Sequence, residues 1–187
     1  MADALGRYAT RNNATGTDKT TSHAYGELYT QLFEPYRTSA KRVLEIGVYS
    51  GASVLAFADF FEGAYIVGVD ITLQNVKFGL EHPRIAYHEV DGTLPAALDK
   101  LGLSVVYDII LDDASHQPDH QVASLDVFAP SLSSGGIYVI EDIDGARATE
   151  LYGRLGAVAA RHGLTMEWHD LRSVKGQFDD IVAVFKK

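Results

Sequence analysis

The sequence of 187 residues contains no cysteine. This absence excludes disulfide bonds, thiolate metal ligands and a cysteine nucleophile. Any metal ion would have to be bound by oxygen atoms or imidazole nitrogens. A chain without cysteine also fits the reducing cytoplasm, where we expect the protein to remain.

Long apolar runs are also missing. No stretch approaches the roughly 20 apolar residues that span a bilayer, and residues 1–13 lack the apolar centre of a signal peptide, so we expect no membrane partner. Basic residues are few, with 16 Lys and Arg against 25 Asp and Glu, which gives a formal net charge of -9. Because such a chain repels a phosphate backbone, nucleic acid is not an expected partner either.

The length and the apolar content of 47% are typical of one soluble globular domain. Residues 1–24 are polar and show no sustained periodicity, which predicts an N-terminal arm or lid. Residues 25–187 are expected to form a single domain.

The most informative stretch is Val105–Asp144. Two apolar runs, 105–111 and 137–140, are expected to be buried parallel strands, because continuous apolar runs without alternation have both faces covered. Residues 119–132 between them have helical spacing. The two strands end in acids, and the ends of neighbouring strands lie roughly 4.8 Å apart, so Asp113, Glu141 and Asp142 would repel one another until a proton or a cation relieved the repulsion. A divalent metal is the simpler answer.

The same reasoning extends to the whole chain. Helices are predicted over 25–36, 52–61, 93–103 and 146–162, and strands over 42–46, 64–70, 84–90, 164–171 and 180–185. The connection between the last two strands is too short for a crossover helix, so this pair should be antiparallel. The predicted fold class is therefore α/β, with a seven-stranded sheet, helices on both faces and the last strand antiparallel.

The residues that follow the first two strands form a pattern typical of nucleotide-binding sites. Gly47 and Gly51 form a turn between a strand and a helix, which brings the backbone and its free N–H groups close to a ligand. Asp70 ends the second strand, where an acid typically binds the two hydroxyls of an adenosine ribose. A dinucleotide is disfavoured, because the turn has two of the three glycines of the G-x-G-x-x-G pattern.

These residues carry a resemblance to a known family. Glu45-Ile46-Gly47 with Gly51, Asp70 and Asp91 resembles the Rossmann-like class I S-adenosylmethionine-dependent methyltransferases. More narrowly, three motifs are similar to the macrolide sugar O-methyltransferases of the macrocin and mycinamicin type, although that family usually has Gly at position 114, where this chain has Ala. The motifs are Gly16-Thr17-Asp18-Lys19 with His23 and Tyr25, Asp112–His116 with His120, and Gly135–Asp142.

The resemblance implies roles for individual residues. The implied metal ligands are Asp113, Glu141 and Asp142, and the implied catalytic base is His116. Asp112 would orient its loop or touch the cofactor. The other positions around the cofactor are Glu45, Gly47, Tyr49, Ser50, Gly51, Asp70, Asp91 and Gly92. Weaker candidates for a lid or for substrate contact are Thr17, Asp18, Lys19, His23, Tyr25 and His120.

The implied activity is methyl transfer from S-adenosyl-L-methionine, with Mg²⁺ or another hard divalent cation, to one hydroxyl of a vicinal diol. The acceptor would be a small molecule, such as a sugar of a natural product or a polysaccharide. Mg²⁺ prefers oxygen ligands and keeps waters that a diol could replace, and a nearby imidazole could then remove the hydroxyl proton. The sequence leaves open whether the protein forms a homo-oligomer.

Other interpretations remain. A catechol-type O-methyltransferase would use similar acids, and a non-catalytic S-adenosylmethionine-binding module would keep the nucleotide turn alone. The acids could simply be solvated strand ends, and His116 could cap the next helix. A hydrolase built on Ser115 and His116 is disfavoured, because adjacent residues project in different directions and no G-x-S-x-G motif is present.

Overall fold

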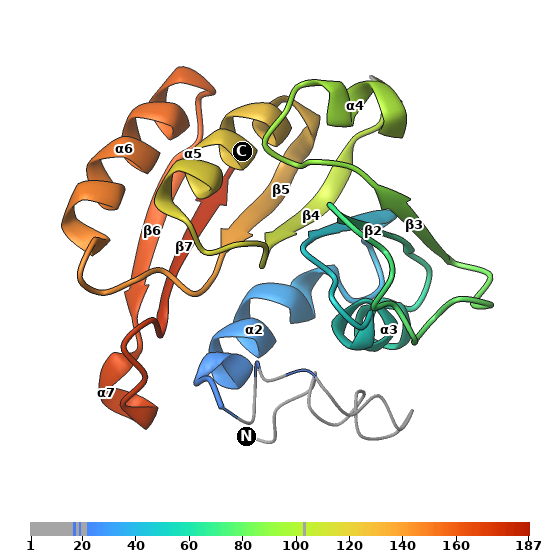
Figure 1. The fold of residues 1–187 in the computed structure, drawn as a ribbon, viewed down its shortest axis with the longest axis horizontal. Coiled ribbons are helices and arrows are strands. Elements are labelled where there is room, and N and C mark those ends of the chain that lie inside the picture. Colours follow the sequence, from blue (N-terminus) through green and yellow to red (C-terminus); the bar gives the residue numbers. More distant parts are fainter. Residues whose placement is uncertain (1–16, 18, 20–21, 103) are drawn as a thin grey trace.

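The computed structural model describes residues 17, 19, 22–102 and 104–187. Most of the predicted arm, including Asp18, lies outside the described residues. The described chain contains one seven-stranded sheet of order β3-β2-β1-β4-β5-β7-β6 (Figure 1). The strands are β1 (Arg42–Ile46), β2 (Tyr65–Asp70), β3 (Ile85–Glu89), β4 (Tyr107–Asp112), β5 (Leu132–Ile140), β6 (Thr165–Asp170) and β7 (Ile181–Lys186).

Strand β7 is antiparallel to both of its neighbours, β5 and β6, and the other neighbouring pairs are parallel. The predicted fold class is therefore confirmed, including the antiparallel final pair. Within the described residues the α-helices are α2 (Tyr25–Phe33), α3 (Ala52–Phe60), α4 (Ala96–Leu101), α5 (Pro118–Phe128), α6 (Ala148–Arg161) and the single turn α7 (Arg172–Lys175).

Both faces of the central strands of the sheet are buried. Val43, Ile109 and Val139 pack with α2 and α3 on one face, whereas Leu44 and Ile110 pack with α4, α5 and α6 on the other. Figure 1 shows these two groups of helices on opposite sides of the sheet. Neighbouring residues of one strand enter different cores, because successive side chains point to opposite faces. This explains why β2, β4 and β7 are largely apolar runs in the sequence, whereas the edge strands β3 and β6 are more polar and only partly buried.

Some boundaries differ from the prediction. The helix expected to reach residue 132 ends at Phe128, and a 3₁₀ turn (Ala129–Ser131) follows, because Pro130 has no N–H to continue an α-helix. Strand β5 begins five residues earlier than expected, at Leu132, which pairs with Tyr107. Its polar and glycine residues concealed this part of the strand. Among the described residues, none of the helices is long and apolar enough to cross a membrane.

The sheet reverses its order between β1 and β4. The chain runs outward from β1 through β2 to β3 on one side and from β4 to β5 on the other. At such a switch point the loops after the strands separate and leave a crevice for a ligand. The loops that follow β1 and β4 meet closely here, since a Cβ added at Gly47 would lie 2.2 Å from the Asp113 carbonyl oxygen.

Candidate active site

A pocket of about 610 Å³ opens at the carboxyl ends of the parallel strands. The loops after β1, β2, β3, β4 and β5 all contribute to it, as expected for a ligand site at the switch point of an α/β sheet. Its lining includes the following predicted site residues: Thr17, Lys19, Gly47, Tyr49, Ser50, Asp70, Asp91, Gly92, Asp113, His116, His120 and Asp142.

One side of the pocket is formed by the residues expected to bind a nucleotide: Gly47 after β1, Asp70 after β2 and Asp91 after β3. We call this side the nucleotide-type wall. One carboxylate oxygen of Asp70 accepts hydrogen bonds from the N–H groups of Val48 (2.9 Å) and Tyr49 (3.1 Å), which ties the end of β2 to the glycine turn. At the end of β3, the hydroxyl and N–H of Thr93 donate to Asp91 and lower the pKa of that carboxyl. The carboxylates of Asp70 and Asp91 therefore line the pocket and are held in place by hydrogen bonds from backbone N–H groups and, for Asp91, from a hydroxyl.

Three further residues expected near a cofactor, Glu45, Gly51 and Asp112, are not among those that line the pocket. Glu45 is fully buried and accepts a hydrogen bond from the Ser53 hydroxyl at 2.6 Å, and burial raises its pKa to about 7. Asp112 is also buried, with its pKa raised to about 7 for the same reason, and it accepts from the N–H of Ala114 at 3.3 Å. Gly51 has a φ of +81°. These positions shape the loops that line the pocket without lining it themselves.

On the other side of the pocket, an imidazole and two carboxylates converge. His116 Nε2 lies 3.2 Å from Asp113 Oδ1 and 3.5 Å from Asp142 Oδ2. One ligand atom from each residue lies within 4.8 Å of the others. Oxygen and imidazole donors at this spacing suit a hard divalent cation. The hydrogen bond with Asp113 raises the pKa of His116, which makes its imidazole a better proton acceptor.

The backbone of this region is held in a sparsely populated conformation. Within residues 22–102 and 104–187, the non-glycine residues with positive φ are Tyr49 (42°), His116 (56°) and Asp142 (54°). All three line the pocket. Each such conformation costs on the order of 1–3 kcal/mol and persists where the surrounding structure enforces it, which is common at functional sites.

Glu141 takes a different direction from Asp142. It is 1% exposed and accepts hydrogen bonds from the Lys19 ammonium and the Tyr29 hydroxyl. The structure thus brings Asp113, Glu141 and Asp142 into one neighbourhood, but Glu141 faces Lys19 instead of the pocket. Its role as a metal ligand stays a prediction.

Lys19 lies among three carboxylates. Its ammonium contacts Asp113 as well as Glu141, and Glu45 Oε1 is 3.8 Å away. Burial alone would lower the pKa of Lys19, but the attraction of these carboxylates outweighs burial and holds the pKa well above its ordinary value. Lys19 is therefore a buried ammonium ion.

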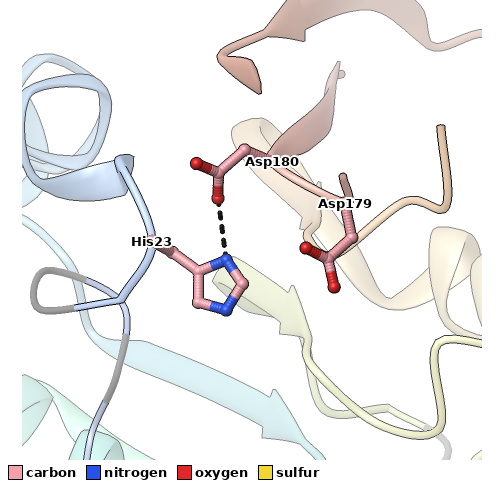
Figure 2. A group of neighbouring side chains, drawn as sticks. All are labelled: His23, Asp179 and Asp180. Atoms are coloured by element: carbon pink, nitrogen blue, oxygen red, sulfur yellow. Dashed lines mark hydrogen bonds and ion pairs between the residues drawn. The ribbon is translucent and has the colours of Figure 1, made fainter. Parts of the chain in front are cut away.

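His23 and Tyr25 support Asp142 from behind. The Tyr25 hydroxyl donates a hydrogen bond to Asp142. The rings of His23 and Tyr25 stack, with their centroids 5.1 Å apart. His23 Nδ1 lies 2.7 Å from Asp180 Oδ1 and 3.4 Å from Asp142 Oδ1. Figure 2 shows the imidazole between α2 and the start of β7, beside Asp179 and Asp180. Neither His23 nor Tyr25 lines the pocket.

Some contributing residues escaped prediction. Tyr29 looked like a packing residue of α2, and Asp180 looked like an ordinary acid at the start of the last predicted strand, so neither carried a signal. Thr72 and Asn75 also line the pocket, and their position just after Asp70 could have suggested it. Ser115 bonds to His120 (2.7 Å) and not to His116.

The strand order and the pocket at the switch point define the architecture of a class I methyltransferase. Residues 44–143 match the family described as "Methyltransferase domain", which is more than half of the chain. The chain belongs to this family, and the predicted family is confirmed.

Two informative relatives are named as O-methyltransferases. The chain is 35% identical over 136 residues to the 8-demethyl-8-alpha-L-rhamnosyl tetracenomycin-C 2'-O-methyltransferase of Streptomyces olivaceus, a match that covers 68% of this chain and 35% of that protein. It is 33% identical over 129 residues to the demethylmacrocin O-methyltransferase of Streptomyces fradiae, covering 65% and 32%. The chain thus spans about a third of the length of the curated relatives it matches.

A solved methyltransferase structure has a similar fold. The MycE methyltransferase of the mycinamycin biosynthetic pathway, in complex with Mg, SAH and mycinamycin VI, superposes with a TM-score of 0.75 at 26% identity. That match covers 100% of this chain and 54% of MycE.

Proposed function

We propose that this protein is an S-adenosylmethionine-dependent O-methyltransferase that requires a divalent metal and acts on one hydroxyl of a vicinal diol, in a sugar of a natural product or polysaccharide. The convergence of Asp113, His116 and Asp142 beside the nucleotide-type wall is the observation that carries the proposal. The relatives support it, because two are named as O-methyltransferases of natural products, one of them rhamnosylated, and MycE was solved with Mg, SAH and mycinamycin VI.

The pocket residues divide into two groups in this proposal. Gly47, Asp70 and Asp91 would hold the cofactor, with Asp70 on the ribose hydroxyls. Asp113 and Asp142 would hold the metal, and Glu141 would become a third carboxylate ligand if it turned from Lys19. The cofactor would supply the methyl group from its sulfonium, and the metal would lower the pKa of the acceptor hydroxyl.

His116 would then remove the hydroxyl proton. Its Nε2 lies within 3.5 Å of oxygens of both Asp113 and Asp142, so a diol bound between those carboxylates would be within reach of the imidazole. The buried Asp142, fixed by the Tyr25 hydroxyl, would keep this geometry. Residues 1–24 would form an arm over the pocket, since Thr17 and Lys19 line it, and residues 25–187 would form the catalytic domain.

A methyl-transfer assay tests the proposal. The acceptor would be a glycoside with two adjacent free hydroxyls, its 2-deoxy counterpart would be the control, and a catechol would be offered in competition. We expect transfer to the diol alone, loss of transfer with EDTA, loss in Asp113→Ala, and a fall of about 100- to 10,000-fold in kcat for His116→Gln.

The matched control is Asp119→Ala, because Asp119 is an exposed acid of α5 that pairs with Arg154. It should leave transfer unchanged. Transfer that survives both EDTA and Asp113→Ala would contradict the metal role. Binding of S-adenosylmethionine without transfer to any acceptor would favour a non-catalytic module.

A further inference from the structure

The buried ammonium of Lys19 occupies the centre of the carboxylate cluster. The residue is 3% exposed, and its ammonium contacts Asp113 and Glu141, with Glu45 at 3.8 Å. A buried charge is stable only when it is paired. Asp113 and Glu141 already place two carboxylates against one ammonium, so the cluster is anionic and Lys19 is an internal counter-ion for part of it.

The carboxylates that Lys19 holds overlap with those a divalent ion would use. Asp113 is shared between the two: Oδ2 contacts Lys19, while Oδ1 faces His116 at the pocket. Glu141 is absent from the pocket lining, and its two oxygens accept hydrogen bonds from Lys19 and Tyr29. A charge-assisted hydrogen bond occupies the same oxygen lone pairs that would bind a metal.

From this geometry we infer that Lys19 is a positioning residue that competes with the divalent ion for Asp113 and Glu141. With Lys19 in place, the site offers two carboxylates to a metal, Asp113 and Asp142. When the Lys19 ammonium moves away from these carboxylates, Glu141 becomes the third carboxylate that the site offers to the metal. Lys19 thereby sets both the affinity and the ligand number of the metal site. This inference rests on the proposed metal-dependent function.

Calorimetric titration with Mn²⁺ in the absence of cofactor and acceptor measures this competition directly. The variant Lys19→Met keeps an unbranched side chain that lacks only the position of the ammonium and so removes the charge, and Lys19→Arg keeps the charge as the matched control. We expect Lys19→Met to bind Mn²⁺ about tenfold more tightly than the wild type. Lys19→Arg should bind no more tightly than the wild type.

A double-mutant cycle with Glu141 identifies the source of the gain. Glu141→Gln should weaken Mn²⁺ binding more in the Lys19→Met background than in the wild type, because Lys19 withholds Glu141 only when it is present. The double variant also restores part of the charge balance in the buried cluster. It therefore keeps the test valid if Lys19→Met alone folds poorly, which thermal unfolding would reveal.

Tryptic cleavage gives a second readout on the wild-type protein. Trypsin must take the lysine side chain into its own pocket, so a docked Lys19 protects the bond that follows it. Mn²⁺ should accelerate cleavage after Lys19, whereas cleavage after the exposed Lys77 should not change.

The outcomes separate this inference from the proposed function. If the wild type binds Mn²⁺ and Lys19→Met binds it no more tightly, the inference fails while the metal-dependent function stands. Unchanged cleavage after Lys19 in saturating Mn²⁺ would also overturn it. If neither the wild type nor Lys19→Met binds Mn²⁺, the metal leaves the proposed function and the inference falls with it.

Discussion

Gly47 shows how closely the loops of the pocket approach one another. Its φ is +85°, and an added Cβ would lie 2.2 Å from the Asp113 carbonyl oxygen and 2.5 Å from the Ala114 Cα. Both obstacles are backbone atoms, so they cannot rotate aside. The loop that carries Asp113 can therefore lie against the end of β1 only when residue 47 has no side chain.

We predict that Gly47→Ala lowers the free energy of unfolding by at least about 2 kcal/mol, through both the clash and the left-handed backbone. Gly63→Ala is the matched control, because a Cβ there would have no atom within 4 Å. Its effect should stay within about 0.5 kcal/mol. Chemical denaturation of both variants checks this, and equal effects would refute the argument from close approach.

Glu45 makes stability depend on pH. Burial raises its pKa to about 7, although Lys19 and the Ser53 hydroxyl oppose that shift. Between about pH 4 and 7 the folded protein therefore holds a proton that the unfolded chain has released. The free energy of unfolding should fall as the pH rises through this window.

The variant Glu45→Gln tests this dependence. Glutamine can still accept the Ser53 hydrogen bond but does not titrate, so we expect a flatter pH profile and a gain of roughly 1–3 kcal/mol above pH 7. Thermal unfolding from pH 4 to 8 measures it, with Glu62→Gln at an exposed glutamate as the control. A wild-type slope retained in Glu45→Gln would show that other groups cause it.

The sequence predicted the two sides of the pocket unequally. Asp113, His116 and Asp142 could be identified, because strand ends and local spacing place them in one region of the fold. The partners of Glu141 could not, because Lys19 and Tyr29 reach it across more than 100 residues of chain. Which oxygen a flexible lysine contacts depends on tertiary packing, and neither composition nor periodicity contains that information.

At the scale of the elements, the buried strands were the most predictable. Strands β1, β2 and β7 each coincide with a mainly apolar run of the sequence, so burial on both faces could be inferred directly. The early part of β5 was missed because Ser133, Gly135 and Gly136 have low strand propensity. Its pairing with β4 is irregular here, with a register shift between Tyr107 and Ile109.

Short helical turns were hidden for another reason. The single turn α7 lies in the connection between β6 and β7, and four residues are too few to show helical periodicity. Lys175 of this turn donates to the His23 carbonyl oxygen at 2.7 Å. The β6–β7 connection thus contacts the segment that carries His23, and Asp180 at the end of this connection bonds the His23 ring (Figure 2).

At the scale of the whole molecule, the pocket connects segments that are distant in the sequence. Its lining runs from Thr17 to Asp142 and includes the loops after five strands. Asp70 fixes the β1 loop from the end of β2, and Asp113 fixes His116 within the β4 loop. A ligand that fills this pocket contacts loops that all depend on one sheet, so its binding energy should stabilise the whole domain.

We therefore predict that S-adenosylhomocysteine raises the melting temperature of the protein. At 100 times its Kd, a ligand specific for the folded state adds about 2.7 kcal/mol. For a domain of this size, that corresponds to a shift of about 5–10 °C. The variant Asp70→Asn should lose most of the shift, because the carboxylate that would bind the ribose is removed, while Asp119→Asn, outside the pocket, should keep all of it. Equal shifts in the two variants, or none in the wild type, would show that the pocket at the switch point does not bind the adenosyl group.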